Sequence, residues 1–142
     1  MTQLAEILKA NPGAESFRFG DYKALCNEVL ALVRAGRKTV TCAALRDIEA
    51  GHEAMPVVGR RDVALEWSGA PALLIETAEV TILPMDEVDA AQVAAMGEFR
   101  DLAHFREGYG RYFERRGGFD PKMKLVVERF RVIEDYSQGG AG

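Results

Sequence analysis

The sequence predicts one α+β domain, with a mostly antiparallel sheet or small β-barrel and flanking helices. The chain has 142 residues, of which 48% are hydrophobic and 28% are charged. This composition is typical of globular proteins and excludes disordered, collagen-like and membrane proteins. A chain of this length forms one core. Helical and strand-like patterns follow the order helix, strands, helices, strand, which favours the α+β class.

The first part of the chain contains two helical patterns. A short apolar stripe at residues 4–8 ends at the helix-breaking residues 11–13. Asp21 is placed to cap a second helix, whose apolar stripe starts at Tyr22 and which ends at Gly36.

Three strand-like segments occupy the middle of the chain. The β-branched residues 38–42 predict a strand, and residues 43–50 predict a helical turn after it. Residues 61–67 and 72–83 predict two further strands. The turn-forming residues 68–71 between them indicate an antiparallel hairpin.

The last third of the chain predicts two helices and a strand. Asp86 opens a helix that runs through Val93, and Asp101 caps another helix that ends at the glycine pair 117–118. Residues 124–134 predict the final strand.

Two glutamates interrupt the apolar faces of these strands. Because side chains alternate along a strand, Glu76 shares a face with Leu74 and Val80, and Glu128 shares one with Phe130. The two carboxylates indicate an inward polar cluster, which serves either catalysis or a structural ion pair.

Charge is unevenly distributed along the chain. The formal net charge is -4, so the molecule as a whole has no positive field that attracts nucleic acid. Residues 73–101 hold seven acidic residues and one arginine, whereas residues 111–131 hold seven basic and three acidic residues. We expect the basic block to form a local RNA-binding face with other cations and aromatic rings, or an ordinary solvated face. The other residues of this predicted face are Arg34, Arg37, Lys38, Arg46, Phe17, Phe19, Tyr109 and Tyr112.

The residue types that bind metals are scattered. Cys26 and Cys42 lie outside any CxxC pair, and His52 and His104 are far apart. We therefore expect no metal, no cofactor and no disulfide framework. The first residues lack a signal-peptide pattern and no apolar run is long enough to cross a membrane, so we expect a cytoplasmic protein without membrane association.

Four segments together carry a resemblance to a known family. Residues 17–21 read FRFGD, residues 36–41 read GRKTVT, residues 75–80 read IETAEV and residues 128–132 read ERFRV. In this order they strongly resemble the ASCH family of PUA-like small β-barrels, and the similarity extends over residues 17–133.

The resemblance implies a compact barrel with a cleft beside its first helix. It divides the chain into an N-terminal helical extension (1–15), the ASCH domain (16–135) and a flexible tail (136–142). Relatives bind or act on RNA, so the implied partner is RNA, a nucleotide or a nucleoside. Two hydrolytic activities are associated with relatives, namely cleavage of single-stranded RNA and removal of the acetyl group from N4-acetylcytidine.

The resemblance also implies site residues. The lysine and threonine of the deacetylating relatives match Lys38 and Thr41, and their glutamate aligns with Met96, so the nearest acid is Glu98. Glu76 is the alternative acid. The expected RNA-binding residues are Phe17, Phe19, Asp21, Arg37, Thr39, Arg46 and Arg111.

Elementary chemistry sets conditions on this site. The Thr41 hydroxyl is a poor nucleophile, and Lys38 acts as its base only when neutral, which requires its pKa to fall by about three units from about 10.4. On a regular strand the two side chains point to opposite faces, so their cooperation requires a bulge or a loop. The alternatives are that Lys38 binds phosphate while Thr41 packs, in a non-catalytic RNA-binding domain, or that helix 101–116 makes the chain a protein-interaction module.

Overall fold

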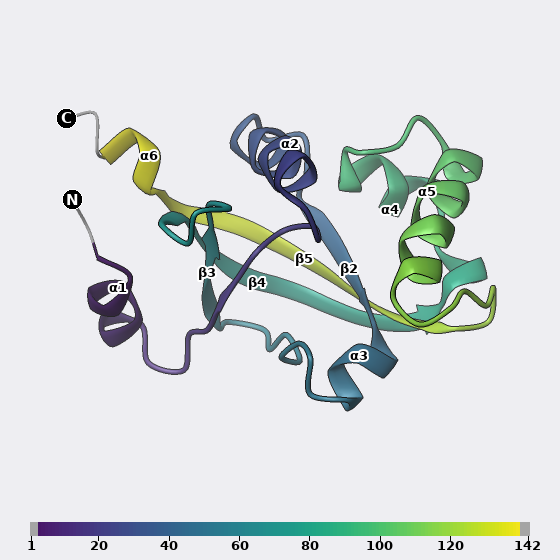
Figure 1. Ribbon diagram of the computed structural model, residues 1–142, viewed down its shortest axis with the longest axis horizontal. Coiled ribbons are helices and arrows are strands. Elements are labelled where there is room, and N and C mark those ends of the chain that lie inside the picture. The colour runs from purple at the N-terminus through teal and green to yellow at the C-terminus, as the bar shows by residue number, and fades with distance from the viewer. Residues whose placement is uncertain (1–2, 140–142) are drawn as a thin grey trace.

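The structure is a computed structural model that describes residues 3–139. At its centre is a mixed sheet in the order β1-β3-β4-β5-β2 (Figure 1). β1 pairs parallel with β3 and the other neighbouring pairs are antiparallel, so the predicted α+β class with a mostly antiparallel sheet is confirmed. The strands are β1 (Ser16–Phe17), β2 (Val40–Ala44), β3 (Arg61–Leu65), β4 (Pro71–Pro84) and β5 (Lys124–Asp135).

Most of the helices lie where the sequence predicts helical segments, whereas the last helix lies in the predicted tail. The helices flank the sheet, whose two long strands, β4 and β5, run across the whole domain (Figure 1). Their bounds are α1 (Leu4–Ala10), α2 (Lys23–Arg34), α3 (Leu45–Glu49), a 3₁₀ turn (Met85–Glu87), α4 (Ala90–Met96), α5 (Leu102–Arg115) and α6 (Tyr136–Gly139). Within residues 3–139, no helix combines the length and apolarity needed to cross a membrane.

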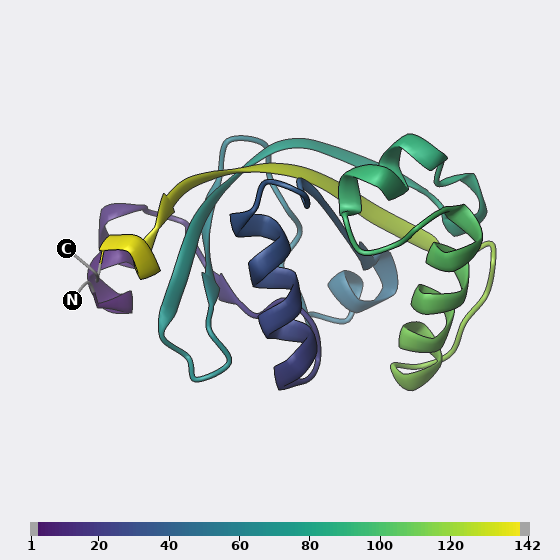
Figure 2. The same ribbon diagram turned by 90° about the horizontal axis from the view of Figure 1, so that it is seen from above.

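The sheet stays open, so the predicted barrel is not confirmed. β1 and β2 form its two edges and do not pair with each other in the described part of the chain. β1 contains two residues, which is too few for the ladder of hydrogen bonds that would close a barrel. Helix α2 instead lies on the concave side of the arch made by β4 and β5 (Figure 2), where it packs on Leu73, Ile75 and Phe130.

The start of α2 differs from the prediction. Tyr22 is its N-cap residue and makes no side-chain capping hydrogen bond. Asp21, the predicted cap, forms an ion pair with Arg115 at 3.3 Å. The predicted cap is therefore wrong, because a guanidinium takes the carboxylate that would otherwise bind the helix end.

The two helices of the last third are both capped by aspartate. Asp89 caps α4, since its carboxylate accepts a hydrogen bond from the backbone N–H of Gln92 and the Gln92 side chain completes a capping box. The predicted start at Asp86 is wrong, because Asp86 lies in the preceding 3₁₀ turn. Asp101 caps α5 as predicted and accepts from the backbone N–H of His104.

Helices α1 and α6 lie together at one end of the sheet (Figures 1 and 2). Ile7 of α1 is buried against Val63 and Leu74 of the sheet. The predicted flexible tail starts at residue 136, where the structure has the short helix α6. The rest of that prediction falls on residues 140–142, which lie outside the described residues.

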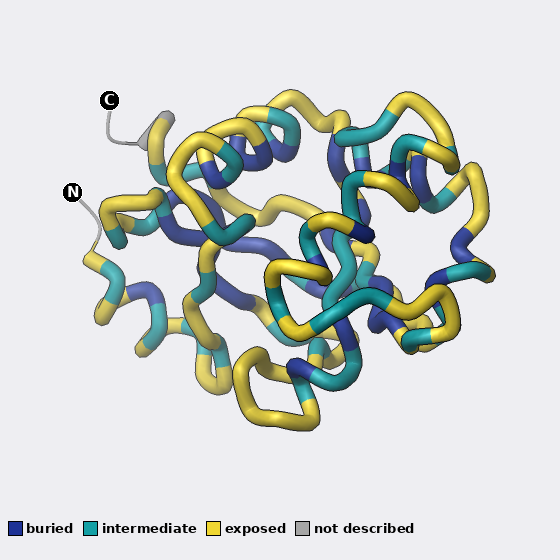
Figure 3. Tube along the Cα trace, turned by 45° about the vertical axis from the view of Figure 1, so that its right-hand side comes forward, coloured by how far each residue is buried: buried dark blue, intermediate teal, exposed yellow. Residues whose placement is uncertain are grey.

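Two apolar clusters hold the centre of the domain. One joins α2 to β3, β4 and β5, and the other joins α4 and α5 to β2 and β5. Exposed helix faces and loops surround these buried strands (Figure 3). Both α2 and α5 also contribute residues to a cavity on the sheet.

Candidate functional site

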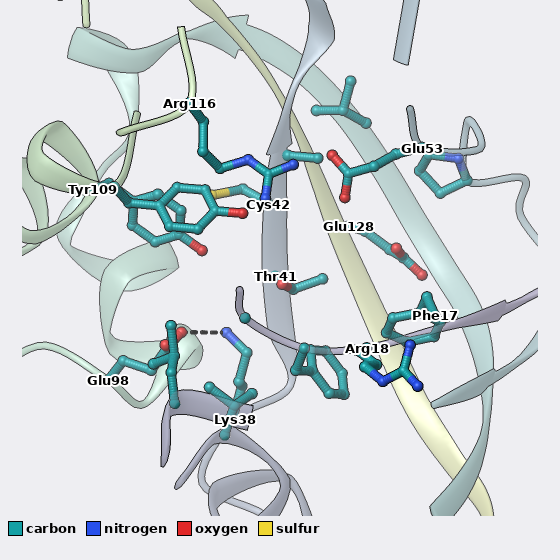
Figure 4. A pocket seen from close by; sticks show the side chains of 18 of the residues that line it. Phe17, Arg18, Lys38, Thr41, Cys42, Glu53, Glu98, Tyr109, Arg116 and Glu128 are labelled. Carbon is teal, nitrogen blue, oxygen red and sulfur yellow. Dashed lines mark hydrogen bonds and ion pairs between the residues drawn. The ribbon is translucent and has the colours of Figure 1, made fainter. Parts of the chain in front are cut away.

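A cavity of about 650 Å³ opens between α2, α5 and the sheet. Thr41 of β2 and Glu128 of β5 line its sheet side, and Phe17 of β1 and Tyr109 of α5 also contribute to its lining (Figure 4). The volume falls in the range of small-molecule pockets, so the cavity has room for a nucleoside.

Lys38 is the most deeply buried charged side chain of the cavity. Its exposed fraction is 2%, and its Nζ donates hydrogen bonds to the carbonyl oxygens of Val40 at 2.8 Å and Met96 at 3.3 Å. A third bond goes to Oε2 of Glu98 at 2.7 Å (Figure 4). These three acceptors match the three N–H donors of an ammonium group.

Glu98 reaches Lys38 because of the way α4 ends. Gly97 closes the helix with a left-handed φ of 74°, a conformation that favours glycine. A Cβ on Gly97 would lie 2.5 Å from the carbonyl oxygen of Arg37, and the backbone N–H of Thr39 donates to the carbonyl oxygen of Ala95 at 2.8 Å. The end of α4 is therefore packed directly against the segment that carries Lys38.

Thr41 lines the same cavity as Lys38 and Glu98. Lys38 lies in the loop before β2, which begins at Val40, so strand alternation does not separate its side chain from that of Thr41. The loop that their cooperation requires is thus present. The structure brings the lysine, the threonine and the nearest acid into one site.

Glu76, the alternative acid, lies away from the cavity. Its neighbour Ile75 lines the cavity, so Glu76 points to the other face of the sheet. There Arg131 and Arg61 bind its carboxylate, the latter at 3.1 Å, and hydrogen bonds from Arg131 and then Arg61 lower the pKa of Glu76. The sequence placed Glu76 inward because of its apolar neighbours, but residues 72–75 are buried on both faces.

Glu128 occupies the inward position that its strand pattern predicts. One oxygen of its carboxylate accepts a hydrogen bond from the hydroxyl of the buried Thr77 at 2.6 Å. Burial raises the pKa of Glu128, the Thr77 hydrogen bond lowers it, and the charge of Asp62 raises it further. The candidate site residues implied by the family resemblance did not include Glu128, although its alternation with apolar residues was the signal that marks it.

The predicted RNA-binding residues separate into two groups. The members that line the cavity are Phe17, Phe19 and Arg111. The members absent from its lining are Asp21, Arg37, Thr39 and Arg46. Asp21 is paired with Arg115, Arg37 and Thr39 are exposed, and the Arg46 guanidinium donates to the carbonyl oxygen of Gly118.

The basic block is not one continuous face. Arginines of α5 line the cavity, whereas Arg129 and Arg131 form ion pairs with glutamates of β4. Arg34 is held by Glu66 at 3.0 Å and by Asp135 at 3.3 Å. The predicted gathering of these cations is therefore wrong, because acidic side chains on neighbouring strands pair with several of them.

The cavity wall from α5 combines aromatic and cationic groups. The guanidinium groups of Arg115 and Arg116 lie 5.5 and 5.4 Å from the ring centroid of Tyr112, and burial raises the pKa of Tyr112 to about 12. Tyr109, Tyr112 and Arg116 follow one another at helical spacing of three and four residues, which puts them on one face. This spacing, and the three-residue spacing from Tyr112 to Arg115, could have identified Arg115 and Arg116, which are not among the individually expected RNA-binding residues.

Cys42 also lines the cavity, beside Tyr109 (Figure 4). Burial raises the pKa of the Cys42 thiol to about 11, so the thiol stays protonated at neutral pH and is a poor nucleophile. Within residues 3–139, no cluster of three or more His, Cys, Asp or Glu side chains is arranged to hold a metal ion. Besides the Cys42 thiol, the cavity lining includes the hydroxyl of Thr41, which the family resemblance predicts as the nucleophile.

Comparisons with known proteins agree with this geometry. A family model described as the ASCH domain matches residues 15–134. A comparison with curated protein sequences finds no significant match.

Solved structures agree with the match to the ASCH family model. An ASCH domain from Lactobacillus crispatus JV V101 is 26% identical with a TM-score of 0.79, and the match covers 89% of this chain and 84% of that one. Protein EF3133 from Enterococcus faecalis V583 is 28% identical with a TM-score of 0.85, over 97% and 90% of the two chains. An ASCH protein from Zymomonas mobilis shares the fold at 12% identity, with a TM-score of 0.53 over 83% and 65% of the two chains.

Proposed function

The chain belongs to the ASCH domain family, and from this premise we propose that it hydrolyses an acyl group from the exocyclic amine of a cytidine-type nucleoside. The cavity holds the base, Thr41 is the nucleophile, and Lys38 with Glu98 moves the protons. The family is associated with RNA, which makes a nucleoside or an RNA nucleotide the expected ligand.

The observation that carries the proposal is the buried Lys38–Glu98 pair. The Lys38 side chain is 1% exposed and the Glu98 side chain 14% exposed, with 2.7 Å between Nζ and Oε2. Burying such a pair costs more free energy than exposing it. Its place in a nucleoside-sized cavity beside a threonine hydroxyl fits proton transfer better than stabilisation of the fold.

The proposed reaction has two steps. Lys38 passes a proton to Glu98 and takes the Thr41 hydroxyl proton, while Oγ1 of Thr41 bonds to the acyl carbon. The bond from that carbon to the exocyclic nitrogen then breaks, and the nitrogen receives the proton from Lys38. Water next attacks the acyl-threonine ester, Lys38 takes a proton from this water and passes it to Oγ1 of Thr41, and the carboxylic acid leaves. Glu98 then returns its proton to Lys38, which restores the starting ion pair.

The walls of the cavity suit a nucleoside. Phe17 and Phe19 pack edge to face with ring centroids 4.9 Å apart. The guanidinium groups of two arginines lie near the ring of Tyr112. Aromatic faces stack bases, and arginines bind phosphate. The arginines at the α5 end of the cavity, among them Arg111, favour a ligand that carries a phosphate.

One observation favours a second function, binding of single-stranded RNA without turnover. All three donors of an ammonium group at Lys38 already have acceptors, so in this state the nitrogen has no lone pair for the Thr41 proton. Turnover requires ligand binding to shift that proton to Glu98.

The test is to incubate the purified protein with N4-acetylcytidine and, separately, with single-stranded RNA that contains it, and to quantify acetate and cytidine. We expect Thr41→Ala to abolish turnover. The dissociation constant should rise by no more than about tenfold, since one hydrogen bond contributes about 0.5–1.5 kcal/mol. Lys38→Ala should weaken both. Thr81→Ala, at an exposed threonine of β4 outside the cavity, is the matched control.

Each outcome decides between the functions. Full turnover by Thr41→Ala rejects the nucleophile. Binding by the wild type without any release of acetate supports the second function, and cleaved RNA in place of acetate rejects the deacylation chemistry.

A further inference from the structure

We propose that Glu128 recognises the base, by sharing one proton with the ring nitrogen N3 of a cytosine-type pyrimidine. The inference rests on the proposed function and adds its specificity-determining residue.

The sheet register places Glu128 beside the proposed nucleophile. Thr41 of β2 and Glu128 of β5 are directly opposed in an antiparallel pair, so their side chains share a face, with Cβ atoms about 4.5–5.5 Å apart. Both side chains line the cavity (Figure 4). The Glu128 carboxyl is therefore the cross-strand neighbour of the Thr41 hydroxyl on the cavity side of the sheet.

The Glu128 carboxyl is held in a defined orientation. The Thr77 hydroxyl donates to its Oε2 at 2.6 Å, and Thr77 is 2% exposed. No hydrogen bond to the second oxygen, Oε1, is found among residues 3–139. One oxygen is thus fixed by the protein and the other is presented to a ligand.

The surroundings of Glu128 favour proton uptake. Burial raises its pKa, and the charge of Asp62 on β3 adds to this rise, whereas Thr77 on β4 and the charge of Arg60 lower it. Arg60 is also bound by Asp62, at 3.0 Å. The neighbour on β2 is the neutral Thr41. The carboxyl therefore takes up a proton more readily than an ordinary glutamate.

The proposed reaction fixes which edge of the base meets Glu128. The acyl carbon must reach Thr41, and this carbon is bonded to the exocyclic nitrogen on C4 of the ring. Of the two ring atoms next to C4, N3 is polar and C5 is not, so the orientation that pairs polar groups turns N3 toward Glu128. In cytosine N3 is an acceptor, which pairs with a protonated carboxyl, whereas in uracil N3 is a donor. A protonated Glu128 presents a donor at this point, so the site should reject uracil, whose N3–H donor would face it.

Binding of the product and its analogue provides the test. Dissociation constants for cytidine and uridine are measured by calorimetry at pH 5.5 and pH 8, so that no turnover interferes. For the wild type we expect cytidine to bind about tenfold more weakly at pH 8, because the shared proton is lost. The affinity for uridine should not fall as the pH rises.

Three variants complete the experiment. Glu128→Gln keeps an acceptor for Thr77 and a permanent donor for N3, so cytidine affinity should become independent of pH. Glu128→Leu has no donor and should bind cytidine about tenfold more weakly than the wild type at pH 5.5. Glu79→Gln, at an exposed glutamate of β4 paired with Arg129, is the control and should follow the wild type. Thermal melts establish that each variant is folded.

The outcomes separate the two proposals. If the wild type releases acetate and binds cytidine but both Glu128 variants bind it with the wild-type affinity and pH dependence, Glu128 does not recognise the base and the proposed function stands. If the wild type neither binds cytidine nor releases acetate, both proposals fail. If Glu128→Leu does not fold, an unchanged pH dependence in Glu128→Gln alone overturns the inference.

Discussion

Two glutamates of this chain form ion pairs in contrasting surroundings. Glu98 meets Lys38 inside the cavity, where the lysine side chain is 1% exposed. Glu76 meets Arg131 and Arg61 on the other face of the sheet, where the arginine side chains are 67% and 42% exposed. The family resemblance predicted Glu98 as the catalytic acid, and the strand pattern of Glu76 made it the alternative.

The contrast shows how the surroundings of an ion pair decide what it can do. An exposed pair is screened by water and contributes little to stability, whereas in a buried pair each charge depends on its partner. Two arginines neutralise Glu76 and lower its pKa, so it is a poor proton acceptor. Glu98 holds one buried ammonium group in the cavity that Thr41 also lines, and a hydrogen-bonded acid and base of this kind can pass a proton.

The largest effect should come from breaking the buried pair. Lys38→Met leaves the carboxylate of Glu98 buried without a counter-charge, which costs about 3–5 kcal/mol of unfolding free energy. Adding Glu98→Leu in a double variant should recover much of this loss, since both charges are then gone. Urea denaturation of the single and double variants measures the coupling, and Glu76→Gln is the exposed counterpart, with little change expected. A Lys38→Met protein as stable as the wild type would show that the pair is not buried in solution.

A second prediction concerns the turn that places Glu98. Gly97 and Gly36 both have a φ of 74°, but a Cβ on Gly97 would lie 2.5 Å from the Arg37 carbonyl oxygen, whereas one on Gly36 would meet no described atom within 4 Å. Both alanine variants carry the left-handed strain of about 1–2 kcal/mol. Gly97→Ala should lose about 1–3 kcal/mol more, because the backbone must move.

This pair of glycines also tests the link from fold to chemistry. Gly97→Ala should reduce acetate release, since Glu98 is displaced from Lys38, while Gly36→Ala should retain it. Equal loss of stability and activity in the two variants would contradict the role of the close contact at Gly97.

Local patterns in the sequence predicted much of the fold. The apolar stripe and the Asp101 cap predicted α5, and the turn at residues 68–71 predicted the hairpin of β3 and β4. Whether the sheet closes into a barrel was not predictable in this way, because closure depends on pairing between segments far apart in the chain. A two-residue β1 at one edge leaves the sheet open, and no local pattern determines how many residues a strand pairs.

The site was predictable in part, for similar reasons. Lys38 and Thr41 are close in sequence, so one motif identified both. The family glutamate aligns with Met96, but Glu98, two residues later, is the acid that meets Lys38. The left-handed turn at Gly97 redirects the chain between these two positions. Glu76 was misplaced, because burial on both faces of β4 removes the difference between an inward and an outward residue.

The smallest effect we predict is a difference in pH dependence between Glu76 and Glu128. Hydrogen bonds from Arg131 and Arg61 lower the pKa of Glu76 below its ordinary 4.5, so its stabilising contribution is present above pH 4.5 and disappears as the pH falls. Burial raises the pKa of Glu128 above 4.5, so its contribution is complete below pH 4.5 and is lost as the pH rises through the raised value. Melting temperatures of Glu76→Gln and Glu128→Gln, each compared with the wild type between pH 3.5 and 7, should therefore diverge in opposite directions. As the pH rises, the wild type should gain stability relative to Glu76→Gln and lose it relative to Glu128→Gln. Differences of the same sign for both variants would mean that the two carboxylates share one kind of environment, and the contrast between the two faces of the sheet would not hold.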